Sequence, residues 1–307
     1  MNRLAGIVVA VVGLVVAILG VMKVVPGLTQ PGIFLILLGG LVIGLSFIDK
    51  PESDGTPRMS TPETLLNIFI APADTFRNLR RHPRWLVAAL IITILSAVFT
   101  NLFLYRLTPE RVTNFAIDKT MEMPMMNDQA RQQIEAGRQD AINQNKDPVM
   151  KVGQAASSFA WSVLKYCIYA LIFLGFALAM GGKINFWQAF SVAVYAAFPV
   201  SVIHSILSSI ILFLKDPADI HPILGQGNLV QDSLSFLFNP SASPAHYTFA
   251  AHIGLLSFYW VWLMATGLKN TGENVSGSTA WTTALSLFGI LLFLGVVGSY
   301  LFSGFMS

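Results

Sequence analysis

The chain has few charged residues and a single cysteine. Charged side chains make up only 11% of its 307 residues, less than half of the roughly 25% that soluble globular domains carry. The lone Cys167 excludes an intrachain disulfide and leaves the redox compartment undefined, so we expect it to act as a small buried hydrophobic residue. Water is therefore not the solvent for which this composition is suited.

Catalytic and metal-binding signatures are also missing. The sequence has no nucleophile elbow, zinc-protease motif, phosphate loop or dinucleotide glycine fingerprint. His204, His246 and His252 lack cysteine or acidic neighbours at metal-ligand spacing, so we expect no metal and no cofactor. The net charge of +3 comes without a dense basic domain, and we expect no nucleic-acid partner. An enzyme is not expected.

Carboxylates are absent from the apolar runs. All sixteen acidic residues lie in polar stretches, whereas ion-coupled transporters usually place carboxylates at bilayer depth. The polar candidates within spans are Lys165, His204 and His252. We expect Lys165 to lie near the end of its span and snorkel to the headgroups, a buried functional lysine being the alternative. We expect the two histidines to make interhelical hydrogen bonds.

Long apolar runs dominate what is present. Hydrophobic residues make up 54% of the chain, its mean hydropathy is +0.63, and each run is long enough to cross a hydrocarbon core of roughly 30 Å as a helix. The sequence therefore predicts an all-α, multi-pass transmembrane bundle of about seven spans. These are residues 4–22, 32–48, 85–105, 158–180, 186–214, 246–268 and 281–302.

The first two spans read as a hairpin. Gly6, Gly13 and Gly20 recur on one face of the first helix, and Gly40 and Gly44 form a small-xxx-small pair on the second. Small residues let membrane helices approach closely, so we expect the two helices to pack on each other through these faces.

The hairpin, residues 1–48, is followed by a polar linker, residues 49–60, rich in helix breakers. Residues 61–84 then predict an amphipathic interfacial helix, capped by Thr61 and broken or restarted at Pro72. Its expected apolar face consists of Leu65, Phe69, Ala73 and Phe76. Its basic stripe, at i, i+3, i+4 and i+7, consists of Arg77, Arg80, Arg81 and Arg84, which we expect to bind anionic lipid headgroups. A plain positive flank that orients the following span is the alternative.

The remaining chain, residues 85–305, contains five spans and two polar interruptions. Residues 106–152 are net neutral, with few apolar anchors, and predict short solvated helices outside the lipid. Residues 215–245 predict a loop with a short interfacial helix around Leu234. The count of flanking cations does not by itself favour either orientation. The arginine cluster before the third span favours an N-terminus inside and a C-terminus outside.

Three stretches resemble the bacterial branch of the Yip1 domain family. They are residues 61–85 (TPETLLNIFIAPADTFRNLRRHPRW), residues 182–199 (GKINFWQAFSVAVYAAFP) and residues 257–268 (SFYWVWLMATGL). The resemblance covers about residues 61–305 and five spans. Ser257 stands where the family often has an acid, and Tyr259 where it has phenylalanine.

The resemblance implies a five-helix bundle in a bacterial inner membrane, with its N-terminal side in the cytoplasm. Eukaryotic relatives are adaptors that bind Rab GTPases and shape or sort membranes, while the bacterial branch supplies no activity to transfer. We therefore expect a non-enzymatic membrane scaffold that engages anionic lipid and recruits a protein partner or another copy of itself. The alternative is a channel or carrier for a small solute, with Lys165, Pro199 and His204 near the pathway.

Overall fold

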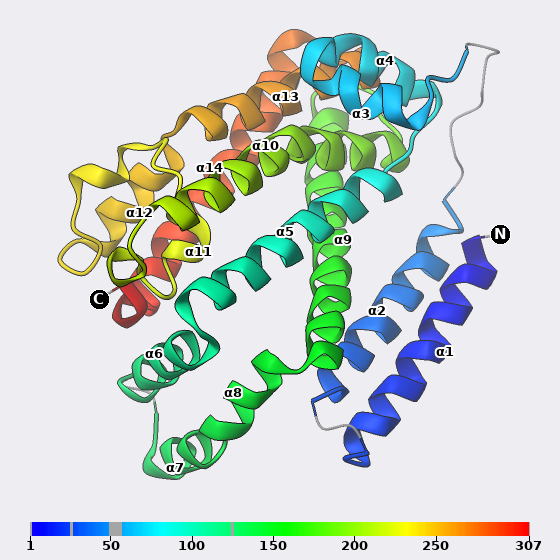
Figure 1. The fold of residues 1–307 in the computed structure, drawn as a ribbon. Coiled ribbons are helices and arrows are strands. Elements are labelled where there is room, and N and C mark those ends of the chain that lie inside the picture. The colour runs from blue at the N-terminus through cyan, green and yellow to red at the C-terminus, as the bar shows by residue number, and fades with distance from the viewer. Residues whose placement is uncertain (1, 25–26, 49–56, 124–125, 307) are drawn as a thin grey trace. The chain divides into compact units, whose positions relative to one another are not determined.

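The computed structural model describes residues 2–24, 27–48, 57–123 and 126–306. Over these residues the chain forms helices joined by turns, with no strand, as the sequence predicts (Figure 1). It divides into two compact units. The first comprises residues 1–94, 149–201 and 260–287, and the second residues 95–148, 202–259 and 288–307. Four long helices contribute several residues to both units: α5, α10, α13 and α14.

The first unit begins with two short pairs of helices and continues with parts of the long ones. Its helices are α1 (Asn2–Val21), α2 (Thr29–Leu45), α3 (Thr61–Ile70), α4 (Pro72–Arg81), the start of α5 (Leu86–Leu107), α9 (Pro148–Ala179), the first half of α10 (Phe186–Leu214), the end of α13 (Leu255–Thr271) and the start of α14 (Gly277–Leu301).

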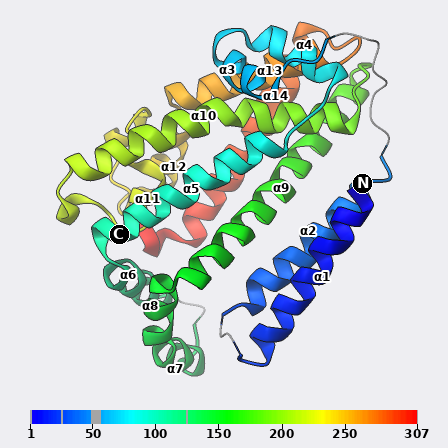
Figure 2. The ribbon, with the colours of Figure 1, turned by 45° about the vertical axis from the view of Figure 1, so that its right-hand side comes forward.

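Helices α1 and α2 form a hairpin and lie side by side in both views (Figures 1 and 2). A Cβ atom on Gly13 would lie 2.6 Å from the backbone nitrogen of Ile36, and one on Gly39 would lie 2.5 Å from that of Ala10. The predicted contact through the α1 glycines is therefore present. The expectation for α2 was wrong, because Gly40 has no atom near its Cβ position and Gly39 faces α1 instead.

Small buried residues also bring the other helices of this unit together. Gly267 on α13 accommodates the ring of Phe76, since an added Cβ would lie 3.0 Å from two of its carbon atoms. Alanines fill the remaining close approaches, which is the usual device for packing helices without a hydrophobic driving force between them. Those that are at most 3% exposed are Ala88, Ala89, Ala170, Ala177, Ala189, Ala193, Ala196, Ala265, Ala280 and Ala284.

Four helices, α5, α9, α10 and α14, are long and apolar enough to cross a membrane by length and composition. They contain 22, 32, 29 and 25 residues, against the roughly 20 that a hydrocarbon core requires. None of the four contains an acidic residue. Two shorter apolar stretches, Gly6–Val21 and Thr29–Leu45, lie in the hairpin.

The long helices expose large apolar side chains. On a protein in water such a surface would be an association or aggregation site, whereas lipid tails cover it without cost. Examples at least 47% exposed are Ile94, Val98, Ile168, Leu171, Ile206, Ile210, Phe213, Leu285, Phe293 and Leu294.

The second unit holds the polar interruptions. Its additional elements are α6 (Pro109–Met121), α7 (Asp128–Ala136), α8 (Arg138–Lys146), η1 (Pro217–Asp219), α11 (Gly225–Asn228), η2 (Leu234–Leu237), α12 (Pro244–His252) and η3 (Ser303–Met306). Helix α7 has no buried residue. The guanidinium of Arg138 instead ties the segment together, donating to Asp118 at 2.7 Å and to Glu135 at 2.7 Å. These carboxylates raise the pKa of Arg138 through their hydrogen bonds.

The sixth expected span, residues 246–268, is broken in the structure. Helix α12 ends at His252 and α13 begins at Leu255. Asp232 explains the break, because its main-chain carbonyl accepts from the Leu255 N–H at 3.2 Å and its carboxylate accepts from the Leu256 N–H at 2.8 Å. The prediction of one continuous helix failed because hydropathy does not register such a distant capping group.

Candidate functional site

The predicted interfacial helix consists of two helices, α3 and α4. Helix α3 is capped by Ser60, one residue before the expected Thr61. The Ser60 hydroxyl accepts from the Glu63 N–H at 3.3 Å, and the Glu63 carboxylate accepts from the Ser60 N–H at 3.1 Å. Pro72 begins α4, because a proline has no N–H to continue the hydrogen bonds of the preceding helix. A single helix over residues 61–84 is therefore excluded.

Helix α4 is fastened to the first unit by its apolar side. Phe76 and Leu79 are fully buried, and the Thr271 hydroxyl approaches the Phe76 carbonyl oxygen at 3.5 Å. Part of the expected apolar face thus packs on protein. On α3, by contrast, Leu66 and Ile70 are 65% and 82% exposed. Exposed apolar side chains on this segment belong to α3, whereas α4 contributes charge.

The end of α4 is held by groups from two distant turns. Arg80 forms an ion pair with Glu273, with 2.7 Å between Nη2 and Oε1. Glu273 and Lys183 exchange two backbone hydrogen bonds of 2.7 Å. The turns around residues 183 and 273 therefore meet each other and α4 at one end of the first unit.

The four predicted arginines do not form one stripe. Helix α4 ends at Arg81, because Pro83 disfavours helical geometry at His82, whose φ and ψ are −126° and 63°. Arg77 forms an ion pair with Asp74 at 2.8 Å. Arg77, Arg80 and Arg81 line one hollow of about 500 Å³, which we call the basic hollow. Its other lining residues are Met59, Asp74, Asn78, Lys269 and Asn270.

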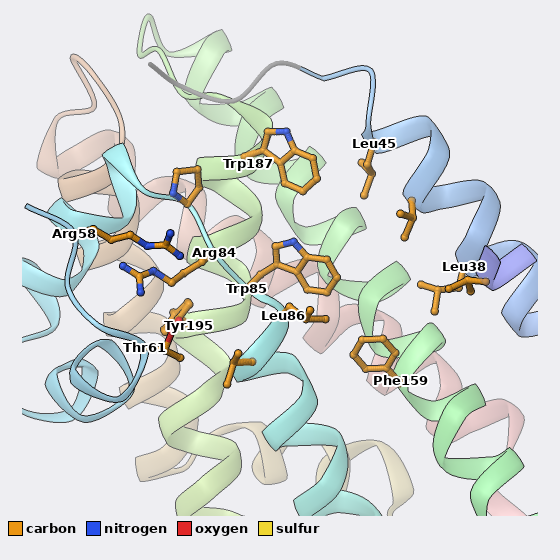
Figure 3. Close-up of a pocket in the computed structure, with 14 residues that line it drawn as sticks. Leu38, Leu45, Arg58, Thr61, Arg84, Trp85, Leu86, Phe159, Trp187 and Tyr195 are labelled. Carbon is orange, nitrogen blue, oxygen red and sulfur yellow. The ribbon is translucent and has the colours of Figure 1, made fainter. Parts of the chain in front are cut away.

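Arg84 lines a different pocket of about 520 Å³, which we call the arginine pocket (Figure 3). Its Nη2 atom donates to the Met59 carbonyl oxygen at 2.7 Å and to the Asn78 side-chain oxygen at 3.3 Å. Burial, followed by the charge of Arg58, lowers the pKa of Arg84. The other lining residues are Val9, Leu38, Val42, Leu45, Thr61, Pro83, Trp85, Leu86, Val87, Phe159, Trp187 and Tyr195.

Two residues that the prediction of the site omitted, Arg58 and Lys269, belong to these hollows. Each lies beside the segment that the arginines mark, yet neither falls on the helical stripe of α4. The sequence did contain one indication of both residues: the count of cations flanking the spans places Arg58 and Lys269 on the same side of the membrane as the α4 arginines. A prediction of the site from one helix's periodicity could not include them.

The predicted intramembrane polar residues lie apart from this site. Lys165 lies near the middle of α9, which begins at Pro148 and not at Ser158, and its position near the end of the membrane span stays a prediction. Its ammonium nitrogen lies 4.9 Å from the ring centre of Tyr166. The described residues contain no group of three or more histidine, cysteine or acidic side chains that could hold a metal.

Both histidines interact with protein groups in the second unit. The His204 Nε2 atom lies 3.1 Å from the Gly227 carbonyl oxygen, and its Nδ1 atom lies 3.4 Å from the Ser208 hydroxyl. His252 is the last residue of α12, where Nδ1 lies 2.8 Å from the Thr248 carbonyl oxygen. The Gly227 contact of His204 joins α10 to the short helix α11, whereas the contact of His252 stays within α12.

The long helices contain no acidic residue, are long enough to span a membrane and have apolar outer faces, and the arginines of α4 lie at one end of the first unit. These features define an integral membrane protein of the multi-pass helical class. The Yip1 domain family model matches residues 66–299. The chain therefore belongs to the Yip1 family, and the resemblance seen in the sequence is confirmed. The hairpin α1–α2 lies outside the matched region. No curated protein and no solved structure gives a significant match to the chain.

Proposed function

We propose that this Yip1 protein is a non-enzymatic scaffold that organises a bacterial inner membrane, with the α3–α4 end facing anionic headgroups on the cytoplasmic side. The observation that carries the proposal is the basic hollow, where Arg77, Arg80, Arg81 and Lys269 surround one space with a single acid, Asp74. Each cation near an anionic leaflet contributes about 1 kcal/mol to attraction.

The exposed side chains of α3 support the same function. Leu66 and Ile70 project from a helix that is otherwise fixed to the protein. Apolar side chains next to a cluster of cations are the two elements by which interfacial helices hold a membrane surface. In this arrangement the N-terminus lies inside, the C-terminus lies outside, and the bundle is free to recruit a protein partner or a second copy.

The test uses the full chain in nanodiscs, with a fluorophore on a cysteine introduced at Ile70 and brominated lipids as quenchers. We expect a brominated anionic lipid to quench this fluorophore more than a brominated zwitterionic lipid at equal content. Joint substitution of Arg77, Arg80 and Arg81 by glutamine should remove most of that difference, because the local excess of anionic lipid depends on these charges.

The matched control neutralises three cations of the second unit, Lys119, Arg131 and Lys146, and should keep the difference. Equal quenching by both lipids in the unmodified chain would contradict the function, as would an unchanged difference in the Arg77, Arg80 and Arg81 variant.

A channel or carrier for a small solute is the second candidate. It is favoured by one observation: Lys165 lies near the middle of a long apolar helix and forms no ion pair with any residue that the structure describes. Intramembrane cations of this kind often mark a pathway. Solute flux into proteoliposomes that is lost in Lys165→Met would establish this function. Absence of flux across a panel of small ions and neutral solutes would count against it.

A further inference from the structure

The arginine pocket has a polar end formed by two guanidinium groups. Figure 3 shows Arg58 and Arg84 side by side, close to Tyr195 and Thr61. Arg58 makes no hydrogen bond and no ion pair with any other described residue. The Nε atom of Arg84 is buried and has no hydrogen-bond partner among the described residues. Two neighbouring cations therefore line the same space, and no described acidic residue forms an ion pair with Arg58.

Nothing in the pocket lining neutralises this charge. None of the fourteen lining residues is acidic. The only acidic side chain that acts on the pKa of Arg84 among the causes resolved for it is Glu63. Its charge raises this pKa by less than burial and the charge of Arg58 lower it. Glu63 does not line the pocket, and its carboxylate accepts from the Ser60 N–H at 3.1 Å. Charge complementarity therefore calls for an anion with several acceptor oxygens, which guanidinium groups bind in a forked geometry.

The rest of the pocket is apolar. Leu86, Val87 and Phe159 line it together with Trp85 and Trp187. Figure 3 shows Trp85 and Leu86 next to each other, with Phe159 farther from the arginines. Tryptophan is enriched at the boundary between headgroups and hydrocarbon because its ring is apolar and its N–H is polar. A pocket that combines cations, tryptophans and aliphatic side chains matches the charged headgroup, the interfacial glycerol and the acyl chain of a phospholipid.

We propose that the arginine pocket binds one anionic phospholipid, with its phosphate between Arg58 and Arg84 and the start of an acyl chain against Leu86 and Val87. A volume of about 520 Å³ accommodates the phosphate, the glycerol and only the first part of a chain. Leu86 and Val87 are 49% and 42% exposed, so the chain continues along a lipid-facing surface. This inference deepens the proposed recognition of anionic lipid, but it uses other cations than the basic hollow.

The test is native mass spectrometry of the full chain in detergent, titrated with phosphatidylglycerol. We expect one tightly bound lipid per chain. Arg58→Gln should weaken that binding at least about tenfold, because it removes a charge-assisted hydrogen bond. The fold should be unaffected, since Arg58 makes no described bond. Arg131→Gln is the matched control: it makes the same change in the second unit, outside both hollows, and should leave the affinity unchanged.

A second measurement locates the acyl chain. Phosphatidylglycerol with a photoactivatable group near the start of its chain should label Leu86, Val87 or Phe159, and Val87→Trp should block this labelling by filling the space. Equal affinity for phosphatidylcholine, or equal affinity of wild type and Arg58→Gln, overturns the proposal. So does labelling confined to other helices. Displacement by glycerol phosphate at the same concentration as the lipid would show a site for free phosphate and also overturns it.

The two proposals fail separately. Loss of the phosphatidylglycerol site in Arg58→Gln, with no effect of the Arg77, Arg80 and Arg81 variant on quenching at residue 70, supports the pocket and contradicts the headgroup function of the basic hollow. The reverse pattern supports the hollow and contradicts the pocket.

Discussion

The side-chain nitrogen of Gln188 donates a 2.8 Å hydrogen bond to the main-chain carbonyl of Arg80. The oxygen of the same amide accepts from the Asn185 N–H at 2.8 Å. One side chain, only 9% exposed, thus satisfies a carbonyl at the end of α4 and an N–H at the start of α10. This side chain therefore links the end of α4, which lines the basic hollow, to the start of α10.

Replacing Gln188 by leucine should loosen α4. The Arg80 carbonyl and the Asn185 N–H would lose their partners in a buried place, at a cost of about 1–3 kcal/mol. Hydrogen exchange of residues 72–81 in nanodiscs should become faster. The control Gln139→Leu removes an exposed amide that pairs with Asn143 in α8 and should leave exchange in α4 as it is. Unchanged exchange in Gln188→Leu would show that the remaining contacts of α4, such as buried Phe76 and the Arg80–Glu273 ion pair, hold it without Gln188.

The glycines of the hairpin differ in whether they face the partner helix. Gly13→Leu should lower the midpoint of thermal unfolding in detergent, because its Cβ position lies 2.6 Å from the Ile36 nitrogen and overpacking costs typically 1–3 kcal/mol. Gly40→Leu is the matched control, since nothing lies within 4 Å of its Cβ position. Equal losses in both variants would mean that α1 and α2 pack through a different face.

Asp232 caps α13 across the break after α12. Asp232→Ala should destabilise the first turn of α13 by about 0.5–2 kcal/mol, the usual effect of removing an N-terminal cap. Faster hydrogen exchange at Leu255 and Leu256 would report it. Asp232→Asn retains an acceptor oxygen and should preserve most of the protection. Unchanged exchange at Leu255 and Leu256 in Asp232→Ala would show that the carboxylate does not cap α13.

Lowering the pH should loosen the contact between α6 and α8. Lys146, at the end of α8, hydrogen bonds with Glu110 of α6 and lowers the pKa of that carboxyl below its ordinary value of 4.5. A depressed folded-state pKa adds stability that is present above 4.5 and is lost as the pH falls through the lower folded-state value. Distances between probes on α6 and α8 should therefore change below pH 4.5, and Glu110→Gln should remove that dependence.

The sequence was sufficient for the features that follow from composition and spacing. Apolar length predicted an all-α membrane bundle, and the heptad spacing of Gly6, Gly13 and Gly20 predicted the face of α1 that meets α2. The partner face on α2 was not predictable, because Gly39 and Gly40 are adjacent and helix rotation decides between them. The rule that proline disfavours a helix interior correctly predicted that a helix breaks or restarts at Pro72.

The features that sequence reasoning missed depend on residues distant in the chain. The break before Leu255 is made by Asp232, and hydropathy gives no weight to a hydrogen bond across such a separation. The arginine stripe failed at Arg84 because Pro83 ends the helix, which periodicity alone ignores. Arg58 lies in the segment expected to be a linker, so its place beside Arg84 needed the fold.

The length of α9 has a consequence for the polar residues that precede it. Its 32 residues rise about 48 Å, and even a tilt of 40°, the upper end of what such helices adopt, leaves about 37 Å along the bilayer normal. A hydrocarbon layer of roughly 30 Å cannot enclose it. One or more turns must stand in the aqueous or headgroup zone. Lys151 and Gln154 in its opening turns identify that end, so the first turns of α9 extend beyond the hydrocarbon layer and their polar side chains keep contact with water.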